Sequence, residues 1–179
     1  MKRYIALLRG INISGKNKLP MADLKDGFAA LGYADVRSHL NSGNLLFSTD
    51  NTEESALAGD IRTMIAERFA LDIPVYILSQ EKLAHILEQA PAWWDTEDKA
   101  IYDNLIFVLP TSTAEEIAAK IGAPTLELEQ VQLCNDAIFW SFDLARHSKA
   151  NWWKKTAAAG IGEHLTIRTA NTVKKLVTM

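Results

Sequence analysis

The order of secondary-structure elements in the first 78 residues constrains the fold more than any other feature of this sequence. Apolar runs and helical spacing predict a strand, a helix, two strands joined by a short turn, a second helix and a fourth strand. We expect these elements at residues 2–8, 20–31, 36–40, 45–48, about 52–69 and 73–78. This β-α-β-β-α-β order is that of the split βαβ, or ferredoxin-like, arrangement.

Residues that favour particular backbone angles mark the joints between these elements. The run Asn41-Ser42-Gly43-Asn44 tolerates positive φ, so it predicts a hairpin turn. Pro20 suits the first position of a helix, and Asn51 or Thr52 can cap the next one. Gly27 is unfavourable inside a helix by about 1 kcal/mol relative to alanine. We therefore expect a close packing contact at Gly27.

The same order of elements recurs in the second half of the chain. We expect strands at 101–109, 125–133, 137–142 and 164–168, and helices at 113–122, 149–159 and 171–177. Thr113 and Glu116 have the spacing of a capping box. Crossover connections in such units are right-handed. The sequence thus predicts an α+β fold of two tandem ferredoxin-like halves with mainly antiparallel sheets.

A helix and a tryptophan-bearing connector separate the two halves. Ser79 is suited to cap the helix, and Trp93 and Trp94 lie in the connector that follows it. We expect the first half to occupy residues 1–78, the helix and connector 79–100, and the second half with its short C-terminal helix 101–179.

Composition narrows the class of protein. The chain has 179 residues, a net charge of −3 and one cysteine, Cys134, which excludes an internal disulfide. No apolar run reaches about 18 residues, and the first apolar run is too short for a signal peptide. We therefore expect a cytoplasmic protein without a membrane partner. The acidic balance argues against tight, non-specific binding of duplex nucleic acid.

A polar loop after the first strand is the main candidate site. Because the first and second strands of the predicted unit run in the same direction, this loop and the hairpin turn lie on one rim of the sheet. Loop amides and fixed positive charges there can present themselves to an anion. The candidate ligand-binding residues are Arg9, Asn12, Gly15, Lys16, Asn17, Lys18, Asn41, Ser42 and Asn44.

The spacing from Gly10 to Lys16 matches that of a phosphate-binding loop, G-x-x-x-x-G-K. Asn17 stands where that motif needs a serine or threonine for Mg²⁺, and the predicted helix does not begin until Pro20. The topology is also not that of a parallel sheet. The loop therefore favours a looser anion site over a nucleoside triphosphatase, with a purely structural turn and solvated lysines as the alternative.

Several short motifs together resemble the widespread bacterial family named domain of unknown function 1697. The N-terminal ones are Leu8-Arg9-Gly10-Ile11-Asn12, Gly15-Lys16, Lys18, Pro20-Met21, Leu24, Leu31-Gly32-Tyr33, Val36, Ser42-Gly43-Asn44 and Phe47. The resemblance implies a duplicated ferredoxin-like architecture over essentially the whole chain. It implies no activity, because none is established for the family.

A C-terminal motif carries the same resemblance less closely. The family tends to have Thr-x-Arg-Asn-x-Asn-Thr-Val, and here Thr166, Arg168, Asn171, Thr172 and Val173 fit that pattern. Thr169 stands where the family has its first asparagine.

Two other functions stay open at this point. Cations and aromatics mix in Arg146-His147-Ser148-Lys149 and Trp152-Trp153-Lys154-Lys155, a composition that suits single-stranded nucleic acid. Adjacent tryptophans on a helix point about 100° apart, so at least one of them is expected to pack inward. The other is an enzyme whose catalytic residues the sequence does not identify. The oligomeric state is likewise left open.

No metal or cofactor site is predicted. The histidines His39, His85, His147 and His164 are scattered, and His85 with Glu88 lacks the second histidine of a zinc-protease motif. No G-x-S-x-G elbow occurs, so a hydrolase serine has no support.

Overall fold

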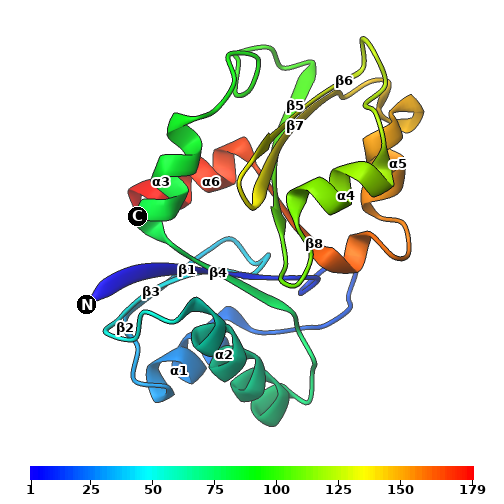
Figure 1. The fold of residues 1–179 in the computed structure, drawn as a ribbon. Helices are drawn as coiled ribbons and strands as arrows, with labels where there is room; N and C mark the ends of the chain where they lie inside the picture. The colour runs from blue at the N-terminus through cyan, green and yellow to red at the C-terminus, as the bar shows by residue number, and fades with distance from the viewer. The chain divides into compact units, whose positions relative to one another are not determined.

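The strand order of one sheet is repeated in the other. The computed structural model describes residues 1–179 and contains two four-stranded antiparallel sheets, with strand orders β2-β3-β1-β4 and β6-β7-β5-β8 (Figure 1). In each sheet the strand that opens the half lies in the centre, next to the third and fourth strands of that half. The fold is α+β with two similar halves, as expected of a tandem ferredoxin-like duplication.

The elements of the first half follow the predicted order closely. They are β1 (Lys2–Leu8), α1 (Met21–Ala30), β2 (Ala34–His39), β3 (Asn44–Thr49), α2 (Glu54–Phe69) and β4 (Val75–Ser79). Helix α3 (Gln80–Glu88) comes next.

The second half contains the same series with a longer final connection. Its elements are β5 (Ile101–Val108), α4 (Ala114–Ile121), β6 (Glu129–Cys134), β7 (Ala137–Asp143), the 3₁₀ helix η1 (His147–Lys149), α5 (Asn151–Thr156), the 3₁₀ helix η2 (Gly162–His164), β8 (Leu165–Thr169) and α6 (Ala170–Thr178).

The chain divides into two units. Unit 1 contains Met1–Ala84 and Lys175–Met179, and unit 2 contains His85–Lys174. The boundaries fall inside α3 and inside α6.

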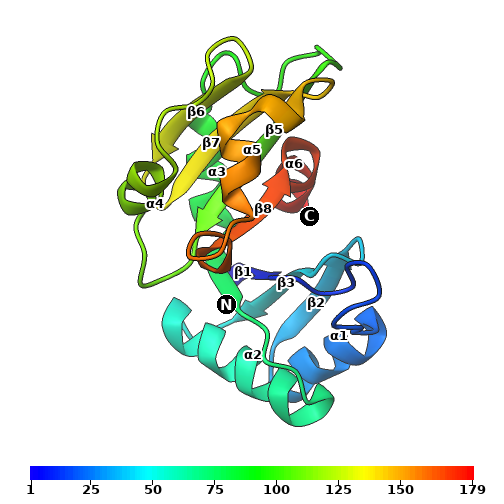
Figure 2. The same ribbon diagram turned by 90° about the vertical axis from the view of Figure 1, so that its right-hand side faces the viewer.

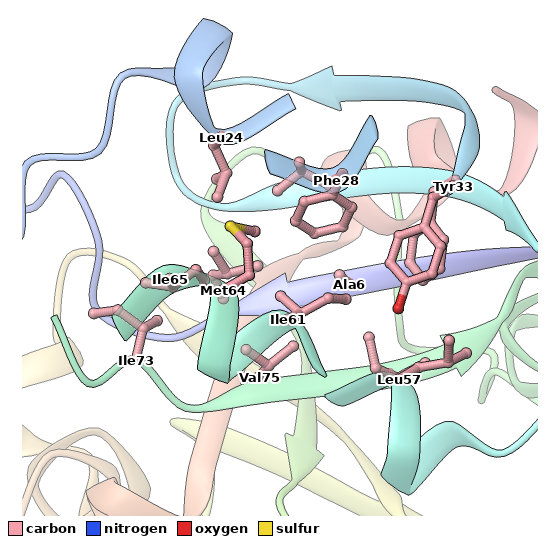
Figure 3. Close-up of a cluster of buried hydrophobic side chains, with 14 of the residues drawn as sticks. Ala6, Leu24, Phe28, Tyr33, Leu57, Ile61, Met64, Ile65, Ile73 and Val75 are labelled. Carbon is pink, nitrogen blue, oxygen red and sulfur yellow. The ribbon is translucent and has the colours of Figure 1, made fainter. Parts of the chain in front are cut away.

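Helices α1 and α2 cover one face of the sheet in unit 1 (Figure 1). Because strand side chains alternate between the two faces, Tyr4, Ala6 and Leu8 of β1 point together into this core. The rest of the core comes mainly from Leu24, Phe28, Leu45, Phe47, Leu57, Ile61 and Ile65 (Figure 3). Phe47 lies between other rings, 4.5 Å from Tyr33 and 5.5 Å from Phe28 between centroids.

Gly27 lies where α1 comes close to α2. A Cβ atom added at Gly27 would lie 2.5 Å from the sulfur of Met64, whose side chain fills this part of the core (Figure 3). The close contact predicted from the sequence is confirmed. Gly59 of α2 is also helical, but a Cβ there would meet nothing within 4 Å.

Replacing each of these glycines by alanine separates helix propensity from packing. We expect Gly59→Ala to raise the free energy of unfolding by about 0.5–1 kcal/mol, because it removes backbone freedom from the unfolded chain. The same gain at Gly27 is offset by displacement of Met64, so Gly27→Ala is expected to leave stability unchanged or lower it. Urea denaturation of both variants measures the difference. Equal stabilisation by both would contradict the packing contact.

The hydroxyl of Tyr33 is buried without a hydrogen-bond partner. Burial, assisted by the negative charge of Asp60, raises the pKa of Tyr33 to about 12 from its ordinary 10.0. The ring packs on Phe28 and Phe47, so the side chain is held by its apolar contacts.

We expect Tyr33→Phe to raise the free energy of unfolding by about 1 kcal/mol at neutral pH, because it removes an unsatisfied buried hydroxyl. The unfolded chain ionises Tyr33 near pH 10.0, whereas the folded chain keeps the proton to about pH 12. Wild-type stability therefore falls as the pH rises through this window, and the phenylalanine variant loses that part of the decline. Denaturation curves at neutral and alkaline pH test both effects. A destabilised variant would show that the hydroxyl has a partner.

Unit 2 packs α4 and α5 against one face of its sheet (Figure 1). Ile106, Ile138 and Trp140 of the strands meet Ile117 of α4 and Trp152 of α5 in this core. The predicted capping box is confirmed: the Thr113 hydroxyl accepts from the Glu116 N–H at 3.2 Å, and the Glu116 carboxylate accepts from the Thr113 N–H at 3.0 Å.

Several predicted boundaries are wrong. Helix α2 has Glu53 at its N-cap with no side-chain cap, because the Asn51 side chain accepts from the Glu53 N–H instead. Pro20 occupies the N-cap of α1 rather than its first turn. Strand β6 begins at Glu129 and not at 125. Residues 125–128 form a turn, in which the Thr125 carbonyl accepts hydrogen bonds from the Leu128 and Glu129 N–H groups.

The helix predicted at 149–159 is also shorter than expected. It is divided into η1 and α5, which ends at Thr156. The turn that follows contains Gly160 at a φ of +80° and leads into η2.

Candidate functional site

The loop after β1 is built from residues in the left-handed backbone region. Asn12, Ser14, Gly15 and Asn17 have φ values of 53°, 49°, 77° and 46°. At the tip, the Lys16 N–H donates to the Ile13 carbonyl at 2.9 Å. Positive φ at both central residues of this turn is the signature of a type I′ turn. The loop is therefore a small folded hairpin of its own.

The side chain of Asn12 ties the loop to the hairpin between β2 and β3. Its Nδ2 donates to the Asn41 carbonyl at 2.8 Å and to the Leu19 carbonyl at 2.9 Å. Its Oδ1 accepts from the Leu19 N–H at 2.8 Å. The two segments predicted to meet at one rim are in direct contact, and Figure 2 shows the blue loop after β1 beside the cyan turn before β3.

Gly43 makes a second contact between the same two segments. The Leu8 N–H donates to the Gly43 carbonyl at 2.8 Å. A Cβ atom added at Gly43 would lie 2.7 Å from Leu8 Cβ, and the φ of Gly43 is +83°. Both the backbone angle and the space therefore require glycine at this position.

The side-chain amides of two further predicted residues, Asn17 and Asn44, donate hydrogen bonds within the rim. Asn17 Nδ2 donates to the Gly10 carbonyl at 2.9 Å, and buried Asn44 donates to the His39 carbonyl at 2.9 Å and to the Ser42 hydroxyl at 3.1 Å. These asparagines shape the rim.

A hollow of about 430 Å³ lies between the two segments. Of the predicted residues, Asn12, Gly15, Lys18 and Asn41 line it, whereas Arg9, Lys16, Asn17, Ser42 and Asn44 do not. The remaining wall is formed by Leu19, Pro20 and Met21.

Helix α1 begins at the wall of this hollow, a feature that the sequence analysis missed. Its N-cap, Pro20, makes no side-chain cap, and the N–H groups of a first helical turn have no acceptor inside the helix. Pro20 predicts the helix start, so the signal is present in the sequence. The one acid in this first turn, exposed Asp23, opposes the positive end of the helix dipole.

Exposed positive charge lies at the hollow, through Lys18, and on the β1 loop, through Lys16. Lys16 and Lys18 are exposed and form no ion pair, whereas Arg9 is half-buried and donates its backbone N–H to the Pro74 carbonyl at 3.0 Å. The rim therefore combines two available cations with a folded, hydrogen-bonded loop.

A smaller hollow of about 180 Å³ in unit 2 gathers acidic residues, among them Asp95, Asp98 and Asp103. Burial raises the pKa of Asp103, against the opposing effect of a hydrogen bond from the Ser141 hydroxyl. Asp95 is paired with Lys174 at 2.7 Å. No group of three or more His, Cys, Asp and Glu side chains in the chain could hold a metal ion.

The duplicated ferredoxin-like architecture and the rim loop define the class of protein, and a family model identifies the family. The model described as protein of unknown function (DUF1697) matches residues 1–139, which include the whole rim. The chain belongs to this family.

A solved structure supports the same assignment over the full length. The conserved bacterial protein SP0830 from Streptococcus pneumoniae is 31% identical to this chain, with a TM-score of 0.86 over 99% of this chain and 97% of that one. No curated protein matches the chain. None of the helices combines the length and apolar character that crossing a bilayer requires.

The C-terminal motif has a structural explanation. Arg168 is buried, and its Nη1 donates to the Thr166 hydroxyl and to the Ile167 carbonyl, both at 2.9 Å. Burial lowers the pKa of Arg168 to about 10. Thr169 precedes α6, and its hydroxyl accepts from the Thr172 N–H at 3.3 Å. Threonine and asparagine can both accept such a bond at the start of a helix. Thr169 can therefore do here what the family's asparagine could do at this position.

Asn12 and Asn17 form a matched pair for testing the clamp, because both have positive φ and both lose an amide on replacement by alanine. Asn12 makes three side-chain hydrogen bonds and Asn17 makes one. At about 1 kcal/mol per bond, we expect Asn12→Ala to lower the free energy of unfolding by about 2 kcal/mol more than Asn17→Ala. Urea denaturation measures this, and equal losses would contradict a clamp at Asn12.

Proposed function

We propose that this protein binds a small anionic ligand, of the phosphate-bearing class, in the hollow between the β1 loop and the β2–β3 turn. The observation that carries the proposal is the placement of Lys18, the first turn of α1 and the Asn41 segment around one hollow of about 430 Å³. Helix N-termini and loop amides attract phosphate oxygens, and a free lysine adds a full positive charge.

The rigidity of the rim supports this proposal. The Asn12 clamp and the contact of Gly43 with Leu8 hold both walls of the hollow before any ligand arrives. A preformed site avoids the free-energy loss of ordering loops on binding. The volume also lies within the range of small-molecule sites, which is roughly 300–1,000 Å³.

The apolar wall indicates what else the ligand carries. Pro20 and Met21 offer apolar side-chain surface to the hollow, and no acidic side chain lines it. A bare phosphate ion would leave this wall unused. A phosphorylated metabolite with an apolar or ring-shaped body, such as a nucleotide, fits the hollow better.

Thermal unfolding with added ligands tests the proposal. We expect phosphate-bearing metabolites to raise the Tm further as their concentration rises, by an amount that corresponds to a stabilisation of about 2.7 kcal/mol at one hundred times Kd. Lys18→Ala is expected to abolish most of the shift, and Lys16→Ala to reduce it. Lys175→Ala, at an exposed lysine in α6 that does not line the hollow, is the matched control.

Two results would contradict the proposal. One is a Tm that no member of a broad panel of nucleotides and sugar phosphates raises. The other is a ligand-induced shift that Lys18→Ala and Lys175→Ala leave equally large.

A further inference from the structure

We propose a second binding site, on unit 2, that takes single-stranded nucleic acid. The site is an aromatic patch formed by Tyr102 of β5, Phe142 of β7, His147 of η1 and Trp153 of α5. It shares no residue with the rim, and three of its four members, Phe142, His147 and Trp153, lie beyond residue 139, where the family match ends.

The structure resolves the roles of the two adjacent tryptophans. Trp152 is 1% exposed, belongs to the core of unit 2 and donates its indole N–H to the Gly122 carbonyl at 3.0 Å. Trp153 is 42% exposed, and its indole lies on the surface. Burial explains Trp152, whereas Trp153 contacts the core only at its edge, through Phe142, and keeps much of its ring exposed.

The four rings are in continuous contact. Phe142 is at the centre, with its ring centroid 5.1 Å from that of Trp153 and 5.4 Å from that of Tyr102. The His147 ring lies 4.6 Å from Trp153, close to perpendicular at 68°. Tyr102 is 41% exposed, so large ring surfaces remain open at both ends of the patch.

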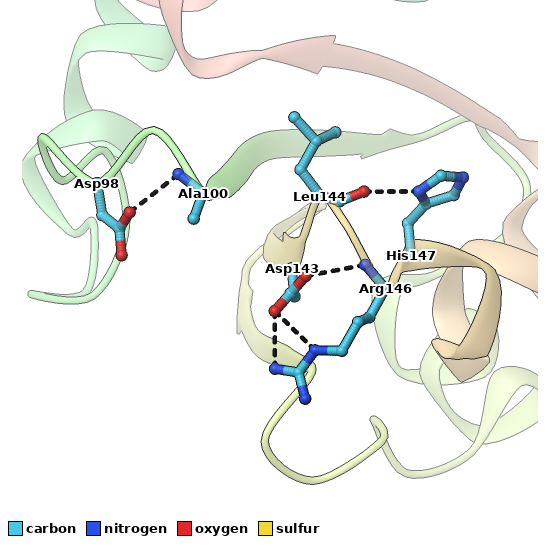
Figure 4. A network of polar contacts seen from close by, with 6 residues as sticks. All are labelled: Asp98, Ala100, Asp143, Leu144, Arg146 and His147. Carbon is cyan, nitrogen blue, oxygen red and sulfur yellow. Dashed lines mark hydrogen bonds and ion pairs between the residues drawn. The ribbon is translucent and has the colours of Figure 1, made fainter.

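Hydrogen bonds fix the turn that carries His147, one of the four rings (Figure 4). The Asp143 carboxylate accepts from the backbone N–H, Nε and Nη2 of Arg146 at 2.9, 2.9 and 2.7 Å, which fixes the turn after β7. The His147 Nδ1 is 2.7 Å from the Leu144 carbonyl oxygen. Rings that are already fixed can stack on bases with little loss of side-chain freedom.

The charge at the Trp153 end of the patch complements a polyanion, whereas Tyr102 at the other end also lines the acidic hollow with Glu97 and Asp98. Lys149 and Lys154 flank Trp153 in sequence, are exposed, and form no ion pair. Asp143 is neutralised by Arg146. Buried Glu129 receives the N–H groups of Trp152, Trp153 and Thr125, so its charge is satisfied inside unit 2.

A hollow of about 340 Å³ adjoins the patch through Phe142. Apolar Ile101, Leu126 and Leu128 line it, and Glu127, which is exposed, is the one unpaired acid at its edge. Such a space can receive an unstacked base. Stacking on the exposed rings of Tyr102 and Trp153, which buried Phe142 supports from below, requires bases that are free of a partner strand, so the patch selects single strands over duplex.

Fluorescence anisotropy with the full chain tests this site. The probes are labelled oligouridylate and oligothymidylate of about 12 nucleotides, at about 50 mM salt, with a duplex of the same length for comparison. We expect both single strands to bind more tightly than the duplex. A difference in Kd between the ribose and deoxyribose probes would show whether the site contacts the 2′-hydroxyl. Trp153→Ala is expected to weaken binding about tenfold, and Trp153→Phe to weaken it less.

Lysine variants test the charge independently of the rings, in case Trp153→Ala folds poorly. Lys149→Ala and Lys154→Ala are each expected to reduce the slope of log Kd against log salt by roughly 0.7. Lys175→Ala, the matched exposed lysine, and Lys18→Ala at the rim are expected to keep the wild-type slope. This comparison separates failure at the patch from failure at the rim.

Three outcomes would overturn the proposal. The first is no binding of either single strand at low salt. The second is binding that Lys18→Ala removes and the variants of Trp153, Lys149 and Lys154 leave intact. The third is concentration-dependent self-association that Trp153→Ala abolishes without any oligonucleotide binding, which would assign the patch to a protein contact.

Discussion

The amide of Asn12 is the interaction on which the rim of unit 1 depends. One side chain satisfies the backbone of Leu19 on one segment and of Asn41 on another, 29 positions further along the chain. Because β1 and β2 run in the same direction on either side of β3, these segments leave the sheet at the same edge. The topology brings them near, and the amide fixes how near. The hollow exists because both conditions hold.

Much of the fold could be predicted because it depends on local patterns. The capping box at Thr113, the turn at Gly43 and the tight contact at Gly27 each follow from a residue type at a particular position. The inward packing of Trp152 also follows, from the 100° between adjacent helical residues. The predicted boundaries are wrong where a side chain from another segment determines the backbone conformation. Residues 125–128 alternate between polar and apolar as a strand would. In the structure, however, the Glu129 carboxylate accepts hydrogen bonds from the Thr125 N–H and from the Trp152 N–H at the start of α5, so residues 125–128 form a turn.

The candidate site was predictable in position but not in the use of its residues. The sequence indicates which residues are polar, but not which of their atoms the protein already occupies. Asn12, Asn17 and Asn44 bind backbone carbonyls, so the groups left for a ligand are Lys16, Lys18 and the open side chain at Asn41. The start of α1 was located from the sequence at Pro20, but it was not counted toward the site because only the fold places it at the wall of the hollow.

The hydroxyl of Thr169, at the start of α6, bears on how relatives of this chain can be recognised. A search pattern that demands an asparagine at this position would pass over this chain, although the bond to the Thr172 N–H is present. A pattern that admits every side chain able to accept that bond would collect a wider and physically coherent set. Differences between relatives at this position would then reflect which side chain caps the last helix, and would not by themselves indicate a difference in function.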